Sequence, residues 1–70
     1  MIRYKGYKIT VSAGQEDDGK WRGSYKLLAI GKTEARSLPD QYLDQTFDSA
    51  SDALVAAENA ARAWIDKNPL

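Results

Sequence analysis

Apolar residues recur at three- and four-residue spacing between residues 49 and 67, which is the pattern of an amphipathic α-helix. Ser49 is a preferred N-cap residue, and Asp52 follows three positions later. At the other end, Asn68 tolerates the left-handed conformation that often ends a helix, and Pro69 cannot continue it. Seven alanines favour the helix and allow a close approach to a sheet. The apolar positions are Ala50, Ala53, Leu54, Ala57, Ala60, Ala61, Trp64 and Ile65.

Upstream of this helix, apolar and polar residues alternate with the period of two that marks half-buried β-strands. The first such run covers residues 7–11 and places tyrosine, isoleucine and valine on one face. Residues 2 and 4 are apolar in the opposite phase, so we expect a bulge or kink at Lys5-Gly6. Asp18-Gly19 can supply the positive φ of a hairpin, which pairs the first strand with the second.

The second strand is predicted over residues 20–30 and the third over residues 42–47, with a long loop at residues 31–40. Leu28 and Ile30 break the alternation of the second strand, so they either cover a sheet edge, follow a bulge or form an exposed apolar patch. We therefore predict one α+β domain over residues 1–70, with a three-stranded antiparallel sheet and one C-terminal helix packed on one face. The expected core is Ile9, Val11, Trp21, Tyr25, Leu27, Phe47, Leu54, Ala57, Ala61, Trp64 and Ile65.

The composition argues against enzyme chemistry. The chain contains no cysteine and no histidine, which removes the usual ligands of zinc, copper, haem and iron–sulfur clusters and the commonest acid–base group. The densest carboxylate cluster, Glu16-Asp17-Asp18, lies in the expected hairpin loop, where water keeps all three groups ionised. We therefore expect a protein that is not an enzyme and that binds no metal or cofactor. The sequence begins with no apolar segment of signal-peptide or membrane-span length, so we also expect a cytoplasmic protein without a membrane partner.

Charge is unevenly distributed along the chain. Residues 1–36 contain eight Lys/Arg and four Asp/Glu, a balance of +4, and residues 37–70 contain two and six, a balance of −4. The basic half of the chain contains the first two predicted strands, and a basic sheet can follow the phosphates of a nucleic acid. The alternative is that these charges only protect the exposed face and edges of a small sheet. This alternative is favoured because no aromatic residue is predicted on that face to stack bases. The residues of the predicted basic face and its surroundings are Lys8, Arg22, Lys26, Arg3 and Lys5.

Several large apolar residues exceed what one helix can cover. They favour a protein interface, for which a homodimer through sheet edges is one arrangement, although small proteins also expose single apolar residues without consequence. We therefore expect a non-enzymatic regulatory or interaction module that binds another protein, with nucleic-acid binding by the basic face as the alternative function. The residues of the predicted protein interface are Leu28, Ile30, Tyr4 and Tyr42.

Two families show a similar pattern. Residues 7–11, the Asp18-Gly19 hairpin, residues 21–27 and Phe47-Asp48-Ser49 before the alanine-rich helix resemble the strand-strand-strand-helix layout of HicB-like antitoxin domains. This resemblance implies a protein partner that is sequestered or regulated. A weaker likeness links the chain to the plant AP2 domain, which reads the DNA major groove with its sheet. It rests on Tyr4-Lys5-Gly6, Gly19-Lys20-Trp21, Thr46-Phe47 and Ala60-Ala61-Arg62-Ala63-Trp64.

Overall fold

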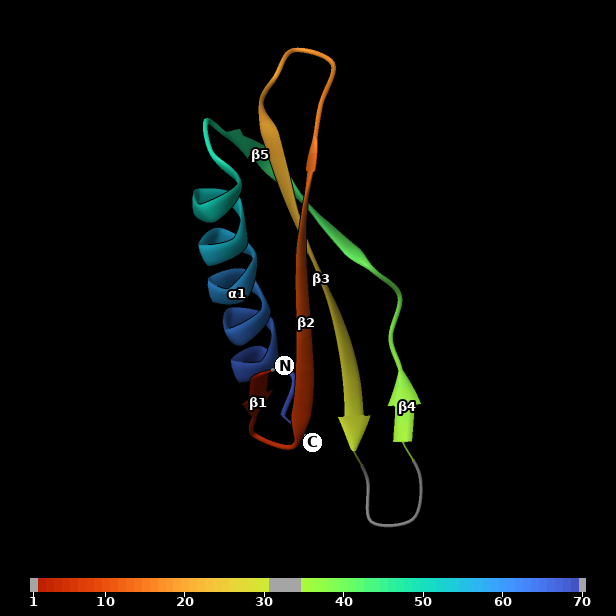
Figure 1. The fold of residues 1–70 in the computed structure, drawn as a ribbon. Helices are drawn as coiled ribbons and strands as arrows, with labels where there is room; N and C mark the ends of the chain where they lie inside the picture. The colour runs from red at the N-terminus through yellow and green to blue at the C-terminus, as the bar shows by residue number, and fades with distance from the viewer. Residues whose placement is uncertain (1, 31–34, 70) are drawn as a thin grey trace.

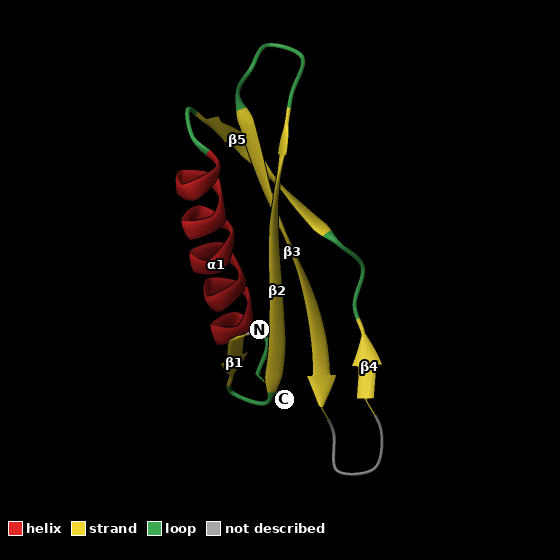
Figure 2. Cartoon of the chain, in the orientation of Figure 1, coloured by secondary structure: helices red, strands yellow, loops and turns green. Residues whose placement is uncertain are grey.

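One helix lies along one face of a five-stranded antiparallel sheet in the computed structural model, which describes residues 2–30 and 35–69 (Figures 1 and 2). The sheet has the order β1-β2-β3-β4, and β5 also pairs with β3. The predicted α+β fold with one C-terminal helix is confirmed, but the predicted number of three strands is wrong. The elements are β1 (Ile2–Tyr4), β2 (Tyr7–Gln15), β3 (Trp21–Ile30), β4 (Ala35–Ser37), β5 (Gln41–Phe47) and α1 (Ala50–Lys67).

The first additional strand, β1, arises because Lys5 and Gly6 form a two-residue turn in place of the expected bulge. Both residues have a positive φ, 48° and 87°, which is the backbone of a tight type I′ hairpin. Tyr4 therefore pairs directly with Tyr7. Residues that are directly opposite in antiparallel strands share a face, so the apparent change of phase is a change of strand.

The second additional strand, β4, lies within the segment that was predicted to be a long loop. It pairs with residues 28–30 of β3, and the N–H of Leu38 donates to the carbonyl oxygen of Leu27 at 2.9 Å. After Pro39 the chain continues as β5, which pairs with the same edge of β3 as β4 does. β4 and β5 therefore each cover a part of that edge. Residues 31–34, also part of the predicted loop, lie outside the described residues.

The core lies between the sheet and α1, and the backbones of β3 and α1 approach each other closely at Gly23. A Cβ atom at this position would lie 2.4 Å from the carbonyl oxygen of Ala53, so the backbones meet where the helix presents alanine. The predicted close approach is confirmed by Ala53, Ala57 and Ala61, which are fully buried. The buried hydrophobic residues are Tyr7, Ile9, Tyr25, Leu27, Ala29, Ala53, Ala57, Ala61 and Ile65. The expected core residues that are only half-buried are Val11, Trp21, Phe47, Leu54 and Trp64.

Two of the predicted local signals are confirmed. The N–H of Asp52 donates to the Ser49 hydroxyl oxygen at 3.1 Å, which is the expected helix cap. Gly19 has a φ of 85° in the loop that joins β2 to β3. These signals act through the local backbone, which explains why they could be found without knowledge of the tertiary fold.

The C-terminal cap differs from the prediction, because Asn68 has a φ of −133° and is not left-handed. Its side-chain amide donates to the carbonyl oxygen of Trp64 at 2.9 Å. Its own carbonyl oxygen accepts a hydrogen bond from the Tyr7 hydroxyl group at 2.9 Å. The end of α1 is therefore held by side-chain hydrogen bonds, one of which ties it to β2.

Candidate binding surface

The face of the sheet that lies away from α1 is called here the open face. In the described part of the chain it is covered by no helix, as Figure 1 shows. The strand registers place its side chains, since Lys8 is opposite Leu28, Thr10 is opposite Lys26, and these positions alternate with buried ones. The main residues of the open face are Arg3, Lys8, Thr10, Ser12, Arg22, Ser24, Lys26, Leu28, Ile30 and Tyr42.

One end of the open face combines apolar side chains with unpaired cations. Leu28 is half-buried, and Ile30, two residues further along β3, is 40% exposed. Three cations, Arg3, Lys8 and Lys26, surround these two side chains. None of the three forms an ion pair within residues 2–30 and 35–69. Leu28 and the two lysines also line a hollow of about 230 Å³ with Thr10 and Ser37. The residues that form this basic-apolar patch are Arg3, Lys8, Lys26, Leu28 and Ile30.

The other end of the open face is polar, and its charge is already paired. The Nε atom of Arg22 donates to a Glu16 carboxylate oxygen at 2.7 Å, and its guanidinium group also donates to the carbonyl oxygen of Leu43. The hydroxyl groups of Ser12 and Ser24 share a hydrogen bond of 2.7 Å. Arg22 therefore lies on the predicted face, but its charge is neutralised by the hairpin loop. Tyr42 also lies at this end and is 68% exposed.

Two predicted site residues, Tyr4 and Lys5, are directed toward α1. The Tyr4 hydroxyl group and the Lys5 ammonium group donate to the same Asp66 carboxylate oxygen, at 2.8 and 2.7 Å. The hydrogen bond from Lys5 is the main reason that the pKa of Asp66 lies below its usual value, and the same bond raises the pKa of Lys5. The Arg62 guanidinium group lies 4.9 Å from the centre of the Tyr4 ring. These contacts tie the β1–β2 turn to the helix, and the two residues do not join the basic-apolar patch.

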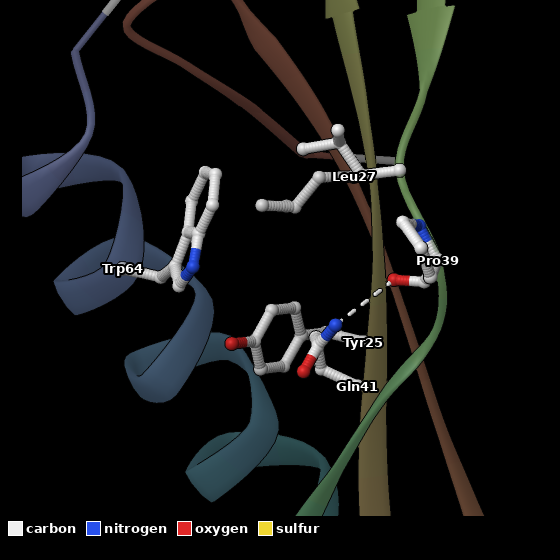
Figure 3. A pocket seen from close by; sticks show the side chains of 6 residues that line it. Tyr25, Leu27, Pro39, Gln41 and Trp64 are labelled. Atoms are coloured by element: carbon white, nitrogen blue, oxygen red, sulfur yellow. Dashed lines mark hydrogen bonds between the residues drawn. The ribbon is translucent and has the colours of Figure 1, made fainter.

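A small apolar hollow lies between α1, β3 and the segment that joins β4 to β5 (Figure 3). Tyr25 and Leu27 line it from β3, Trp64 from the helix, Leu38 and Pro39 from the connecting segment, and Gln41 from the start of β5. Its volume is about 80 Å³. Sites for small molecules usually measure roughly 300–1,000 Å³. We therefore interpret this hollow as a packing gap.

The acidic hairpin loop has a structural role. Glu16 binds Arg22, and an Asp18 carboxylate oxygen accepts the N–H of Lys20 at 2.9 Å. Among the described residues, no three acidic side chains come together to hold a metal ion. No helix in these residues is both long enough and apolar enough to span a membrane.

One feature of the sheet was missed by the sequence patterns. β2 has nine residues, but β1 pairs only with the segment from Tyr7 to Ile9. The rest of this edge of β2 has no neighbouring strand in the part of the chain that the structure describes. The available signal was the small, uncharged character of residues 10–14, which is unusual for an exposed edge.

The resemblances to HicB-like and AP2 domains depend on sequence pattern alone. No family model, no curated protein and no solved structure matches this chain. Both resemblances therefore stay predictions.

Proposed function

We propose that this chain is a non-enzymatic interaction module, which regulates another protein by binding it on the basic-apolar patch. The observation that carries this proposal is the position of Leu28 and Ile30 on the face that no described helix covers. Removing apolar surface from water is favourable by roughly 25 cal/mol per Å², before the entropic costs of association are subtracted. A partner that covered these two side chains would gain this free energy, and the surrounding cations would select its charge.

The charges indicate the chemistry of the partner. Arg3 is opposite Lys8 on neighbouring strands, and Lys26 is opposite Thr10, so the three cations lie close together. A second copy of the patch would bring like charges together, which is unfavourable. A surface with carboxylates around apolar side chains would neutralise the cations and cover Leu28 and Ile30. We therefore propose an acidic, partly apolar segment of a different protein as the ligand.

Nucleic-acid binding is the second candidate, because Arg3, Lys8 and Lys26 make no ion pair among the described residues. Two observations make it weaker than protein binding. Arg22 is engaged by Glu16, and the exposed Tyr42 lies at the other end of the open face, away from the unpaired cations. A phosphate backbone would also leave Leu28 and Ile30 without an apolar partner.

The proposal is tested with a random peptide library displayed on phage and selected against the immobilised protein. We expect the selected peptides to combine Asp or Glu with large apolar residues. Ile30→Asp and the double variant Lys8→Glu/Lys26→Glu should each weaken binding of a selected peptide by at least about tenfold, which corresponds to about 1.4 kcal/mol. The matched controls, Val55→Asp and Lys67→Glu, change exposed residues of α1 and should leave the affinity unchanged.

Far-UV circular dichroism of each variant shows whether it is folded. Selected peptides without carboxylates, or equal losses in the controls, would contradict the proposal. Single- and double-stranded oligonucleotides are titrated in parallel at increasing salt concentration. Micromolar binding that falls steeply with salt and is abolished by Lys8→Glu/Lys26→Glu would assign the patch to nucleic acid instead.

A further inference from the structure

The free edge of β2 is a second surface, separate from the open face. Tyr4 and Tyr7 close a two-residue turn, so they form a hydrogen-bonded pair in which both residues direct N–H and C=O groups at each other. Every second residue after Tyr7 directs its backbone groups to the same edge. Beyond Ile9 these residues are Val11, Ala13 and Gln15, and no strand in the described part of the chain pairs with them.

This edge lacks the features that usually prevent strand pairing. Natural edges are protected by charged side chains, proline or bulges. Residues 11–15 contain neither charge nor proline, and their pairing with β3 is regular. By contrast, β5 carries Asp44 and a register shift, and β4 carries Arg36. The free edge of β2 is therefore a suitable template for another strand.

An apolar surface continues from this edge onto α1. Ile2, Ile9 and Val11 line a hollow with Thr10 at the point where β1 ends. Val55 is 60% exposed and lies seven residues before Arg62, so both are on the same side of the helix. Because Arg62 contacts the ring of Tyr4 in β1, this is the side of α1 that overlooks the β2 edge.

We propose that a second copy of this chain pairs with this edge, so that two β2 strands lie antiparallel about a two-fold axis at Ala13. β1 occupies the edge as far as Ile9, which leaves residues 11–15, and Ala13 is their midpoint. In this register Val11 of each copy is opposite Gln15 of the other, and each hydrogen-bonded pair exchanges two N–H···O bonds. No like charges face each other, and the same residues serve both copies, as a two-fold interface requires. The two helices lie on one side of the joined sheet with Val55 beside the axis.

The neutral edge favours a second copy as the occupant. A strand of opposite charge has nothing to recognise here, whereas an identical uncharged strand meets no repulsion. The open face stays exposed in this dimer, so the inference does not depend on the proposed function. Ile30→Asp should weaken peptide binding and keep the dimer, whereas the edge variant described next should keep peptide binding and lose the dimer.

The first test is the mass of the protein in solution by sedimentation equilibrium. The wild type should approach twice the chain mass of 7.8 kDa as the concentration rises. Ala13→Pro removes an N–H group that points to the free edge and leaves the β2–β3 ladder complete, so this variant should be folded and monomeric. A wild-type protein that stays monomeric at millimolar concentration, or a folded Ala13→Pro variant that still forms dimers, would overturn the inference.

The second test does not depend on the proline variant. The chain has no cysteine, so Ala13→Cys introduces the sole thiol group. Opposite hydrogen-bonded residues have Cα atoms about 5.5 Å apart, within the range of a disulfide, so oxidation should link two copies at least about tenfold faster than in a control. The matched control is Ala35→Cys in β4, which lies at the opposite edge of the sheet. Equal rates for the two variants would contradict pairing at Ala13.

Discussion

The close packing of α1 against β3 depends directly on Gly23. The atom nearest to an added Cβ is the backbone carbonyl oxygen of Ala53, at 2.4 Å, and the Ala57 methyl carbon follows at 3.2 Å. A backbone atom cannot rotate away as the end of a long side chain can. Any side chain at this position must therefore push α1 away from the sheet or distort β3.

Gly23→Ala should lower the free energy of unfolding by about 1–3 kcal/mol, because it overpacks the contact between α1 and β3. Urea denaturation measures this change. Gly14→Ala is the matched control, since a Cβ at Gly14 meets no atom within 4 Å. Equal stability of Gly23→Ala and the wild type would show that the helix can shift at little cost.

Asp66 makes the contact between α1 and the β1–β2 turn sensitive to acid. Hydrogen bonds from Lys5 and Tyr4 hold its pKa below the usual value, so the folded state binds a proton less readily than the unfolded chain. Its stabilising contribution is therefore present above about pH 4 and is lost as the pH falls through the folded pKa.

Asp66→Asn should consequently be less stable than the wild type at pH 7, and this difference should shrink as the pH falls through the folded pKa of Asp66. Urea denaturation at several pH values measures the difference. Asp44→Asn serves as the control, because Asp44 makes no ion pair within the described ranges. A difference between Asp66→Asn and the wild type that did not change with pH would contradict the assignment.

At the scale of elements, the start of α1 is specified by Ser49. Ser49→Ala removes the acceptor for the N–H of Asp52 and should cost about 1 kcal/mol of stability. Ser51→Ala, an exposed position two residues further on in the first turn of α1, should change stability by less than about 0.5 kcal/mol. Thermal denaturation of the two variants compares them directly, and equal losses would argue against the cap.

The long elements could be predicted from the sequence, and the short ones could not. α1, β2 and β3 each extend over enough residues for their periodicity to be visible. β1 and β4 have three residues each, and all three residues of β4 are exposed, so alternation is not detectable. The β1–β2 turn was also hidden, because Lys5 has a positive φ, which is uncommon for a residue other than glycine.

The length of a strand and the visibility of its alternation also decide for which site residues the face of the sheet could be predicted. Lys8 and Lys26 lie on the open face because alternation in β2 and β3 determines it. The contacts of Tyr4 and Lys5 with α1 could not be predicted, because the change of strand at the turn was not visible in the residue pattern. The pairing of Arg22 with Glu16 depends on the shape of the hairpin loop, which the residue pattern does not specify.

At the scale of the whole molecule, the chain presents two surfaces with different chemistry. The basic-apolar patch lies on the open face of the sheet, and the neutral edge of β2 lies at its side. A dimer through the edge would leave both patches on the same side of one continuous sheet. Each dimer would then present two equivalent binding surfaces to acidic partners.

The most direct test of the basic-apolar patch is an amide chemical-shift map of the isotopically labelled protein, titrated with a peptide selected by phage display. We expect the largest shifts at Lys8, Lys26, Leu28 and Ile30, and no shifts on the exposed side of α1. Shifts confined to α1 would contradict the assignment of the basic-apolar patch as the protein-binding surface.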